Sequence, residues 1–313
     1  MRISPRVHFI KKSLRTLCLI ALLGGVWTAT ACTSEADKLI NRQSEVLQAD
    51  PNNVTALILR AEGFKEKNEN AKALIDLNRA IDLAPESARA HLIRSEVYFQ
   101  DRAYENALTD ANKALTINTE LSKAYAIRGQ ARVALEQDFA QALVDLDDAI
   151  QKGENTPEVH RYRGKALVRL NRKSDAQLAY QEALNQLSNR SSSTTNSSVD
   201  RVQGRQMVEI ATEAITQTGA NAIFYESRGE GYRLQKQYDA AIDDFTEVIR
   251  LNPQSASAFQ KRADAYYATG KCDQAVADLR TACRLGNSSL CDQISLGCNS
   301  PTPQVSADLS IDP

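Results

Sequence analysis

Large aromatic side chains are scarce in this sequence of 313 residues. Only 6% of the residues are Phe, Trp or Tyr, although 42% are hydrophobic, and there is a single Trp. So few rings cannot fill a thick globular core, because protein interiors are close-packed. The composition therefore predicts many contacts between small side chains such as Ala, Leu and Ile.

An excess of charge of either sign is also missing. The chain carries 38 basic and 39 acidic residues, for a formal net charge of −1. A general nucleic-acid binder carries a strong basic excess, so we expect no nucleic-acid partner. The 13 Gly and 8 Pro are too few for collagen or for a chain disordered throughout.

The residue patterns of common enzymes are absent too. The sequence has no Gly-rich phosphate loop, no G-x-S-x-G and no H-E-x-x-H. After residue 31 it contains only two His, His91 and His160. We therefore expect no catalytic residues, no cofactor and no metal site.

Residues 1–31 have the pattern of an export signal. Five basic residues precede the apolar stretch 17–26, which is followed by Ala29-Thr30-Ala31. A basic start, a short apolar run and an A-x-A site are the features of a secretory signal, and the run is short for a membrane span. Cleavage after Ala31 would leave 33 basic and 39 acidic residues, so the mature chain is acidic.

The next residue, Cys32, has two interpretations. Residues 29–32 resemble a bacterial lipoprotein box, although Ala29 stands where such boxes prefer Leu. Four other Cys lie near the far end of the chain and can form two disulfides with one another, so no cysteine remains to pair with Cys32 in the mature chain. We therefore expect lipidation of Cys32, and Thr33 after it favours the periplasmic face of the outer membrane. The alternative is plain cleavage, which gives a soluble periplasmic or secreted protein.

A regular period runs through the rest of the chain. Arg recurs at a nearly constant spacing, with one interval about twice as long as the others, and Asp follows the same rhythm. Within one unit, 222–255, Tyr225, Gly229 and Tyr232 share one helix face, and Ala241, Phe245 and Val248 form a second stripe. The pattern predicts two helices per unit. The recurring Arg are Arg60, Arg94, Arg128, Arg163, Arg228 and Arg262.

This pattern resembles the tetratricopeptide repeat, a helix–turn–helix unit of about 34 residues. The resemblance implies an all-α fold, a right-handed superhelical solenoid of antiparallel helix pairs. The framework residues of the first full repeat are Leu57, Ala61, Phe64, Ala73, Leu77, Ala80 and Pro85. The expected organisation is a signal peptide over 1–31, a capping helix over 35–53, four repeats over 54–190, a Ser/Thr-rich linker with an extra helix over 191–221, two repeats with a disulfide-locked C-terminal capping helix over 222–298, and a disordered tail over 299–313.

The recurring Arg and Asp should face each other. Residues that meet across an antiparallel hairpin have a nearly constant sum of numbers, and the sum for Arg60 with Asp76 is within one of the sum given by apolar neighbours. A bidentate Arg–carboxylate pair would fix the register of the two helices. In the fourth repeat Ala179 replaces the Asp and leaves Arg163 without that partner. The expected pairs are Arg60–Asp76, Arg94–Asp110, Arg128–Asp145, Arg228–Asp244 and Arg262–Asp278.

The late Cys follow the same antiparallel logic. Cys272 and Cys283 would lie about 16 Å apart on one helix, too far to bond. The nested pairs Cys283–Cys291 and Cys272–Cys298 both centre on the turn near residue 287, and the eight-residue spacing resembles cysteine-rich secreted helical-repeat proteins. We therefore expect these two bridges. A zinc site is the weaker alternative, because there is no C-x-x-C and no nearby His.

The resemblance also implies where a partner binds, because the first helix of each repeat lines a concave face. On that face Arg161, Lys165 and Arg169 form one ridge of a helix, and acidic residues follow further along the chain. We expect one groove with a basic middle and an acidic end; a solvated charged surface is the alternative. The predicted partner-binding residues are Arg89, Phe99, Lys123, Arg161, Lys165, Arg169, Glu226, Glu230, Asp264 and Tyr267.

Two functions are compatible with these features. The first is a non-enzymatic scaffold or adaptor of the bacterial cell envelope, held to the membrane by an N-terminal lipid, that binds other envelope proteins or peptides. The second is a structural or self-associating envelope component.

Overall fold

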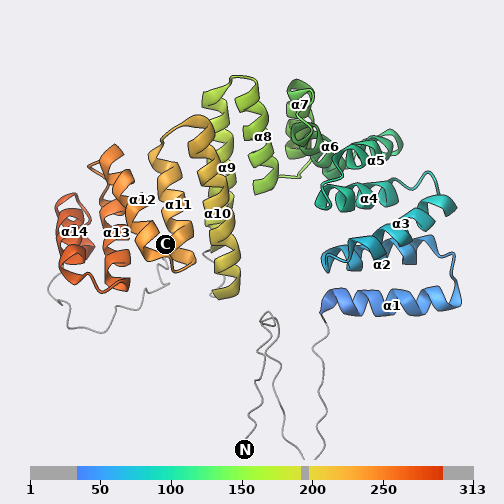
Figure 1. Cartoon of the computed structure of the whole chain (residues 1–313), viewed down its shortest axis with the longest axis horizontal. Helices are drawn as coiled ribbons and strands as arrows, with labels where there is room; N and C mark the ends of the chain where they lie inside the picture. The colour runs from blue at the N-terminus through green and yellow to red at the C-terminus, as the bar shows by residue number, and fades with distance from the viewer. Residues whose placement is uncertain (1–33, 192–196, 292–313) are drawn as a thin grey trace, which may run out of the picture. The chain divides into compact units, whose positions relative to one another are not determined.

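The computed structural model describes residues 34–191 and 197–291. Within these two ranges the chain forms fourteen α-helices and one short 3-10 helix, and no strand (Figure 1). The all-α fold predicted from the sequence is therefore confirmed. The predicted signal peptide, Cys32 and the C-terminal tail lie outside the described residues.

The helices fall into two compact units, the first ending at Val97 and the second beginning at Tyr98. Each unit is described by itself. The helices of the first unit are α1 (Glu35–Ala49), α2 (Val54–Glu66), α3 (Asn70–Leu83) and most of α4 (Ala88–Gln100).

The second unit begins with the last turn of α4. Consecutive helices pack against each other along this unit, as expected for a stack of helix hairpins. Its helices are α5 (Tyr104–Ile117), α6 (Ser122–Ala134), α7 (Phe139–Gln151), α8 (Pro157–Arg169), α9 (Lys173–Ser191), α10 (Ser197–Thr218), α11 (Ala222–Leu234), α12 (Tyr238–Leu251), α13 (Ala256–Ala268) and α14 (Cys272–Arg284), followed by the 3-10 helix η1 (Ser288–Leu290).

Local sequence signals start the first helices of several repeats. The side chains of Asn53, Thr156 and Ser255 each accept a hydrogen bond from a backbone N–H in the first turn of α2, α8 and α13. Such caps satisfy backbone donors that have no partner inside the helix. The hairpin turn after a first helix then uses a left-handed residue, such as Asn68 or Lys236.

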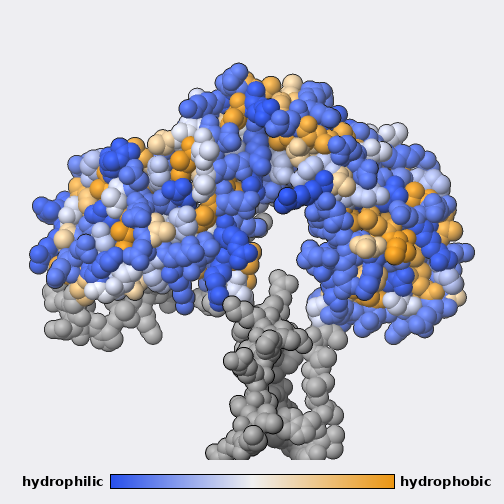
Figure 2. Space-filling view, in the orientation of Figure 1, coloured by the Kyte–Doolittle hydropathy of each residue, from blue (hydrophilic) through white to orange (hydrophobic). Residues whose placement is uncertain are grey.

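Alanines make the close helix contacts that the composition predicts. Ala73 and Ala80 on α3, and Ala142 and Ala149 on α7, are fully buried. Larger buried side chains, such as Leu57 on α2 and Leu77 on α3, complete the core of each hairpin. On the outside of each unit, hydrophilic side chains surround the hydrophobic ones (Figure 2).

The recurring Arg lie at the centre of the hairpins. Arg60 donates two hydrogen bonds to Asp76, from Nε at 2.8 Å and from a terminal nitrogen at 2.7 Å. The Asp76 side chain is 5% exposed, so the pair is largely shielded from water. The structure forms the same two-pronged contact in four of the five expected pairs: Arg60–Asp76, Arg128–Asp145, Arg228–Asp244 and Arg262–Asp278.

The remaining positions differ. Arg94–Asp110 would join residues of the two units and stays a prediction. Arg163 does have a carboxylate partner, which the sequence did not predict: its Nε donates to Asp147 of the preceding hairpin at 2.6 Å. Because half of the Asp147 side chain is exposed, this pair is much less shielded than Arg60–Asp76.

Five of the recurring Arg also reach back to the preceding repeat. Each of these donates to a polar side chain sixteen residues earlier, on the second helix of the previous hairpin. In this way one guanidinium ties its own hairpin to the one before. The acceptors are Ser44, Asn78, Asn112, Asp147 and Thr246, for Arg60, Arg94, Arg128, Arg163 and Arg262. Ser44 lies on α1, so α1 contacts the first repeat as a second helix does.

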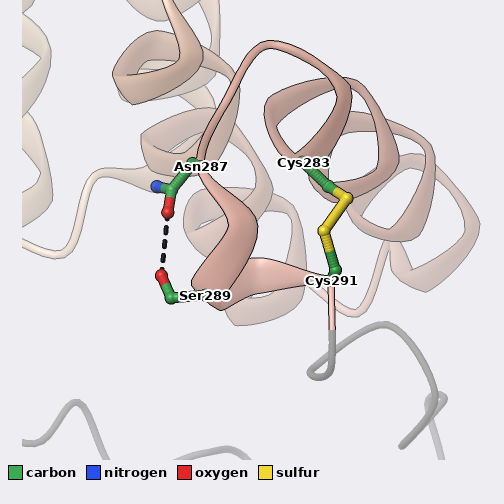
Figure 3. Close-up of a disulfide and its surroundings, with 4 residues drawn as sticks. All are labelled: Cys283, Asn287, Ser289 and Cys291. Atoms are coloured by element: carbon green, nitrogen blue, oxygen red, sulfur yellow. Dashed lines mark hydrogen bonds between the residues drawn. A yellow bond between two sulfur atoms is a disulfide. The ribbon is translucent and has the colours of Figure 1, made fainter.

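A disulfide joins Cys283 on α14 to Cys291, just after η1 (Figure 3). The two Cα atoms are 5.3 Å apart, within the range that a disulfide requires. In the turn between them, Asn287 Oδ1 accepts a hydrogen bond from Ser289. Cys298 lies outside the described residues, so the bridge Cys272–Cys298 stays a prediction.

Helix α10 interrupts the simple alternation of hairpins. The sequence predicts a Ser/Thr-rich linker with an extra helix over 191–221. The structure forms a helix there, and this helix, α10, packs against both α9 and α11 inside the second unit. It also contacts α8, and α8 contacts α6, the first helix of the preceding repeat.

Helix α10 therefore takes the place of a first helix, and α11 takes the place of a second one. Two glycines let the backbones of α10 and α11 come close: a Cβ on Gly204 would lie 2.6 Å from the carbonyl oxygen of Gly231, and a Cβ on Gly231 would lie 2.7 Å from that of Gly204. Since α11 is by its sequence the first helix of the next hairpin, the roles of first and second helices exchange at this point.

Candidate partner-binding groove

The groove between α8 and α10 contains the basic ridge that the sequence predicts. Arg161 on α8 donates from Nε to Glu213 on α10 at 2.8 Å, and its terminal nitrogen lies 2.7 Å from Glu209. Lys165, one turn later, lies 3.5 Å from Glu213. The ridge is therefore partly neutralised by the carboxylates of α10.

Glu213 is the central acceptor of this groove. One carboxylate oxygen accepts from Arg161, and the other accepts from the hydroxyl of Tyr180 on α9 at 3.0 Å. Only 15% of the Glu213 side chain is exposed. Burial and the neighbouring Glu213 raise the pKa of Tyr180, so its hydroxyl stays protonated as the donor.

A cavity of about 400 Å³ opens at the C-terminal end of α8. Its size is near the lower end of the range for ligand pockets, so it suits one large side chain. Aromatic and aliphatic groups form much of its wall, with two basic and two acidic residues. We call it the aromatic cavity; its lining is Tyr104, Val133, Ala134, Glu136, Phe139, Tyr162, Lys165, Val168, Arg169, Glu213 and Gln217.

Rings and cations pack together around this cavity. Phe99 lies with its ring centre 5.3 Å from that of Tyr104 and 5.9 Å from that of Tyr162. The ammonium of Lys165 lies 4.7 Å from the Tyr162 ring, and the guanidinium of Arg169 lies 4.8 Å from the Phe139 ring. Cations over ring faces are attracted by the ring quadrupole, which holds both basic side chains against the wall.

A second cavity, of about 420 Å³, opens at the N-terminal end of α8. Leu187 and Ile210 supply its apolar wall, and Glu158, Glu209 and Arg161 supply charge. We call it the acidic cavity; its lining is Thr156, Pro157, Glu158, Arg161, Leu187, Gln206, Glu209 and Ile210.

The charges of the acidic cavity affect one another. Burial raises the pKa of Glu158, and the carboxylates of Glu209 and Glu213 raise it further, against the lowering effect of Arg161. Burial alone would lower the pKa of Arg161, but these carboxylates raise it more, so the guanidinium stays charged. Three carboxylates thus share one guanidinium, with Lys165 nearby.

Three more predicted residues lie on first helices. Arg89, on α4 of the first unit, contacts both carboxylate oxygens of Glu62 at 2.9 Å. Lys123 is exposed on α6. Arg169 pairs with Glu136 at 2.9 Å at the rim of the aromatic cavity.

The predicted acidic residues lie on α11 and α13. Glu226 pairs with Lys261 at 2.7 Å, and Glu230 pairs with Arg233. Since α10 stands between α8 and α11 and exchanges the helix roles, the structure does not join these residues with the basic ridge into the one groove that the sequence predicts. The surface formed by α11 and α13 is separate.

Asp264 has the most shifted carboxyl of that separate surface. Neighbouring groups partly shield its carboxyl from water, which is the main reason that its pKa is raised to about 6. The positive charge of Arg233 lowers this pKa, and the negative charge of Glu230 raises it. Tyr267, on the next turn of α13, packs against the buried cluster of Ala263 and Leu279. That Glu226, Glu230, Asp264 and Tyr267 bind a partner stays a prediction.

Sequence reasoning missed several residues of the groove, among them Glu209, Glu213 and Tyr104. Glu209 and Glu213 were overlooked because α10 has no counterpart in the repeat period, so no repeat position identified them. Their four-residue spacing on a predicted helix, facing a helix with Arg161 and Lys165 at the same spacing, was the available signal. Tyr104 was missed because it begins a second helix.

The groove offers binding surfaces rather than reactive groups. Its rings and aliphatic side chains can bury apolar side chains, and its carboxylates and cations can pair with charged ones. No described helix is both long and apolar enough to cross a membrane.

Comparisons with known proteins identify the repeats. A family described as "Tetratricopeptide repeat" matches residues 58–122, and one described as "TPR repeat" matches residues 229–270. The two matches cover parts of both units.

Individual relatives match short stretches. Hsc70-interacting protein 1 of Drosophila melanogaster is 31% identical over 80 residues, which are 26% of this chain and 21% of the relative. Small glutamine-rich tetratricopeptide repeat-containing protein 2 of Saccharomyces cerevisiae is 34% identical over 65 residues, 21% of this chain and 19% of the relative. The chain thus spans about a fifth of the length of these curated relatives.

A solved tetratricopeptide repeat protein from Parabacteroides merdae is similar over 84% of this chain and 92% of its own, with 17% identity and a TM-score of 0.40. Tetratricopeptide repeat proteins are protein–protein interaction scaffolds. The two family matches, together with helices packed in consecutive pairs, show that this chain contains tetratricopeptide repeats.

Proposed function

We propose that this protein is a non-enzymatic interaction scaffold of the bacterial cell envelope that binds partner peptides or helices on the face formed by α6, α8 and α10. One observation carries the proposal: this face holds two cavities next to partly buried charges, whereas its helices are otherwise packed together. Buried apolar walls with a few placed polar groups are typical of binding sites.

Site-specific photo-crosslinking tests this surface in the full-length protein. Gln217 is exposed at the aromatic cavity, and Gln274 is exposed on α14 and serves as the matched control. A photoreactive residue at position 217 should capture a defined partner in intact cells. Capture of the same species with equal yield from position 274, or no capture at 217, would refute binding at this face.

The envelope location is a separate part of the proposal and is supported by the sequence alone. The basic start, the apolar stretch and Cys32 after Ala31 are those of an exported lipoprotein. Incorporation of labelled palmitate that disappears in Cys32→Ala would support lipidation. If the wild-type protein takes up no label and is found in the soluble periplasmic fraction, simple cleavage would be supported instead.

A further inference from the structure

The two cavities of the groove lie along the same helix. The aromatic cavity uses α8 residues from Tyr162 to Arg169, and the acidic cavity uses those from Pro157 to Arg161. The pair Arg161–Glu213 lies between them, because Arg161 lines one cavity and Glu213 lines the other. A bound chain that follows α8 would therefore reach both.

The chemistry of the two cavities differs. In the aromatic cavity the charges balance, two basic against two acidic residues, and Tyr104, Phe139 and Tyr162 offer ring surfaces. Contacts between aromatic rings are stabilising beyond the burial of their apolar surface, so an aromatic side chain of the partner would bind well against this wall. A charged group there would meet charges of both signs.

In the acidic cavity two carboxylates face one guanidinium. That guanidinium, Arg161, is already engaged by Glu213 and Glu209, and its distance to Glu158 is 3.6 Å. Glu158 is about half exposed, and Glu209 is 57% exposed, so both can be reached by a ligand. A further cation would relieve the repulsion between these carboxylates.

We propose that the partner presents an aromatic side chain to the aromatic cavity and a Lys or Arg side chain to the acidic cavity, four residues apart in an extended segment. This inference rests on the proposed function and specifies the chemistry of its ligand.

The spacing follows from helix and strand geometry. Glu158 and Lys165 mark the two cavities and lie seven residues apart on α8, which is about 11 Å along the axis at 1.5 Å per residue. In an extended peptide, side chains on the same side lie about 7 Å apart at i and i+2 and about 13 Å apart at i and i+4. The second spacing is the closer match to the groove.

Synthetic peptides test this ligand chemistry against the full-length protein. Fluorescein-labelled peptides of twelve residues in a Gly/Ser background would carry Lys-x-x-x-Phe or Phe-x-x-x-Lys, because either chain direction can place both side chains. We expect the better of the two to bind at least tenfold more tightly than Glu-x-x-x-Phe, Lys-x-x-x-Ser and Lys-x-Phe. Equal anisotropy curves for all peptides would overturn the proposal.

Matched variants assign each side chain to its cavity. Glu158→Gln with Glu209→Gln should weaken the Lys peptide at least fivefold and leave the same peptide with norleucine in place of Lys unchanged. Ala134→Phe, which fills the aromatic cavity, should abolish the advantage of Phe over Ser. Glu120→Gln with Glu247→Gln removes two carboxylates elsewhere and should change nothing.

Melting curves of all variants should match that of the wild type, which excludes misfolding. If the double Gln variant binds the Lys peptide as tightly as wild type, the acidic cavity does not select a cation and the inference is wrong. Capture of a partner at position 217 without any preference among the peptides would refute the inference alone. No capture at position 217 would refute the proposed function.

Discussion

Arg161 on α8 and Glu213 on α10 are 52 residues apart in the sequence and are joined by a hydrogen bond of 2.8 Å. Only 15% of each side chain is exposed, so the pair is held in a poorly hydrated site. This pair ties the additional helix α10 to the first helix of the fourth repeat and forms the wall between the two cavities.

Replacement of Glu213 should therefore destabilise the second unit strongly. In Glu213→Ala the largely buried Arg161 loses its main partner and the Tyr180 hydroxyl loses its acceptor. Breaking a buried ion pair on one side costs about 3–5 kcal/mol. Glu209→Ala, at a position 57% exposed, should cost less than about 1 kcal/mol. Urea unfolding curves of the two variants check this, and similar losses would contradict it.

The recurring Arg should likewise differ in how much stability is lost when each is replaced by Ala. Arg60→Ala leaves the buried Asp76 carboxylate unpaired and should cost about 2–4 kcal/mol. Arg163→Ala removes a contact to the half-exposed Asp147 and should cost about 1 kcal/mol or less. Arg228→Ala, in the same unit as Arg163, should behave like Arg60→Ala. Equal shifts of Tm for Arg163→Ala and Arg228→Ala would refute this distinction.

The close contact of α10 with α11 depends on Gly204. A methyl group there would meet the carbonyl oxygen of Gly231 at 2.6 Å, so Gly204→Ala should force the helices apart. Overpacking of this kind costs about 1–3 kcal/mol. Gln206→Ala on the exposed side of α10 is the control and should change stability by no more than about 0.5 kcal/mol. Thermal melts that show Gly204→Ala to be as stable as the control would disprove the tight contact.

Asp264 should make stability depend on pH. Its pKa is raised to about 6 in the folded protein, mainly because neighbouring groups partly shield its carboxyl from water. A carboxyl with a raised folded pKa favours folding only while it is protonated, so its contribution is present below about pH 4 and is lost as the pH rises through about 6. Asp264→Asn should therefore be more stable than wild type at pH 7.5.

Because Asp264 is exposed, solvent screening should keep this gain below about 1 kcal/mol. At pH 3.5 the two proteins should have the same stability. Urea unfolding at both pH values measures the difference. A gain that is the same at both values would show that the carboxyl of Asp264 is not its source.

Much of the fold could be predicted because the same residue pattern recurs in successive repeats. The spacing of Arg60 and Asp76 recurs along the chain, and the antiparallel sum rule converts that spacing into contacts that the structure forms. The contacts from these Arg to the preceding hairpin follow the same period, and Asn78 and Asn112, one repeat length apart, could have revealed them.

The groove could be predicted only in part, because its second wall is not a repeat. Phe99, Lys165 and Arg169 were found from repeat positions and do line or contact the aromatic cavity. Glu213 and the exchange of helix roles at α10 depend on tertiary packing that no periodicity encodes. For the same reason the acidic residues Glu226 and Glu230 were assigned to a groove from which α10 separates them.

Binding at the face of α6, α8 and α10 is tested most directly by the affinity of the partner captured through position 217 for two versions of the protein. One is the wild type, and the other is Ala134→Phe, which fills the aromatic cavity and should melt at the same temperature. If the face of α6, α8 and α10 is the binding surface, the Kd should rise at least tenfold in the filled variant. An unchanged Kd would show that the partner does not bind at this face.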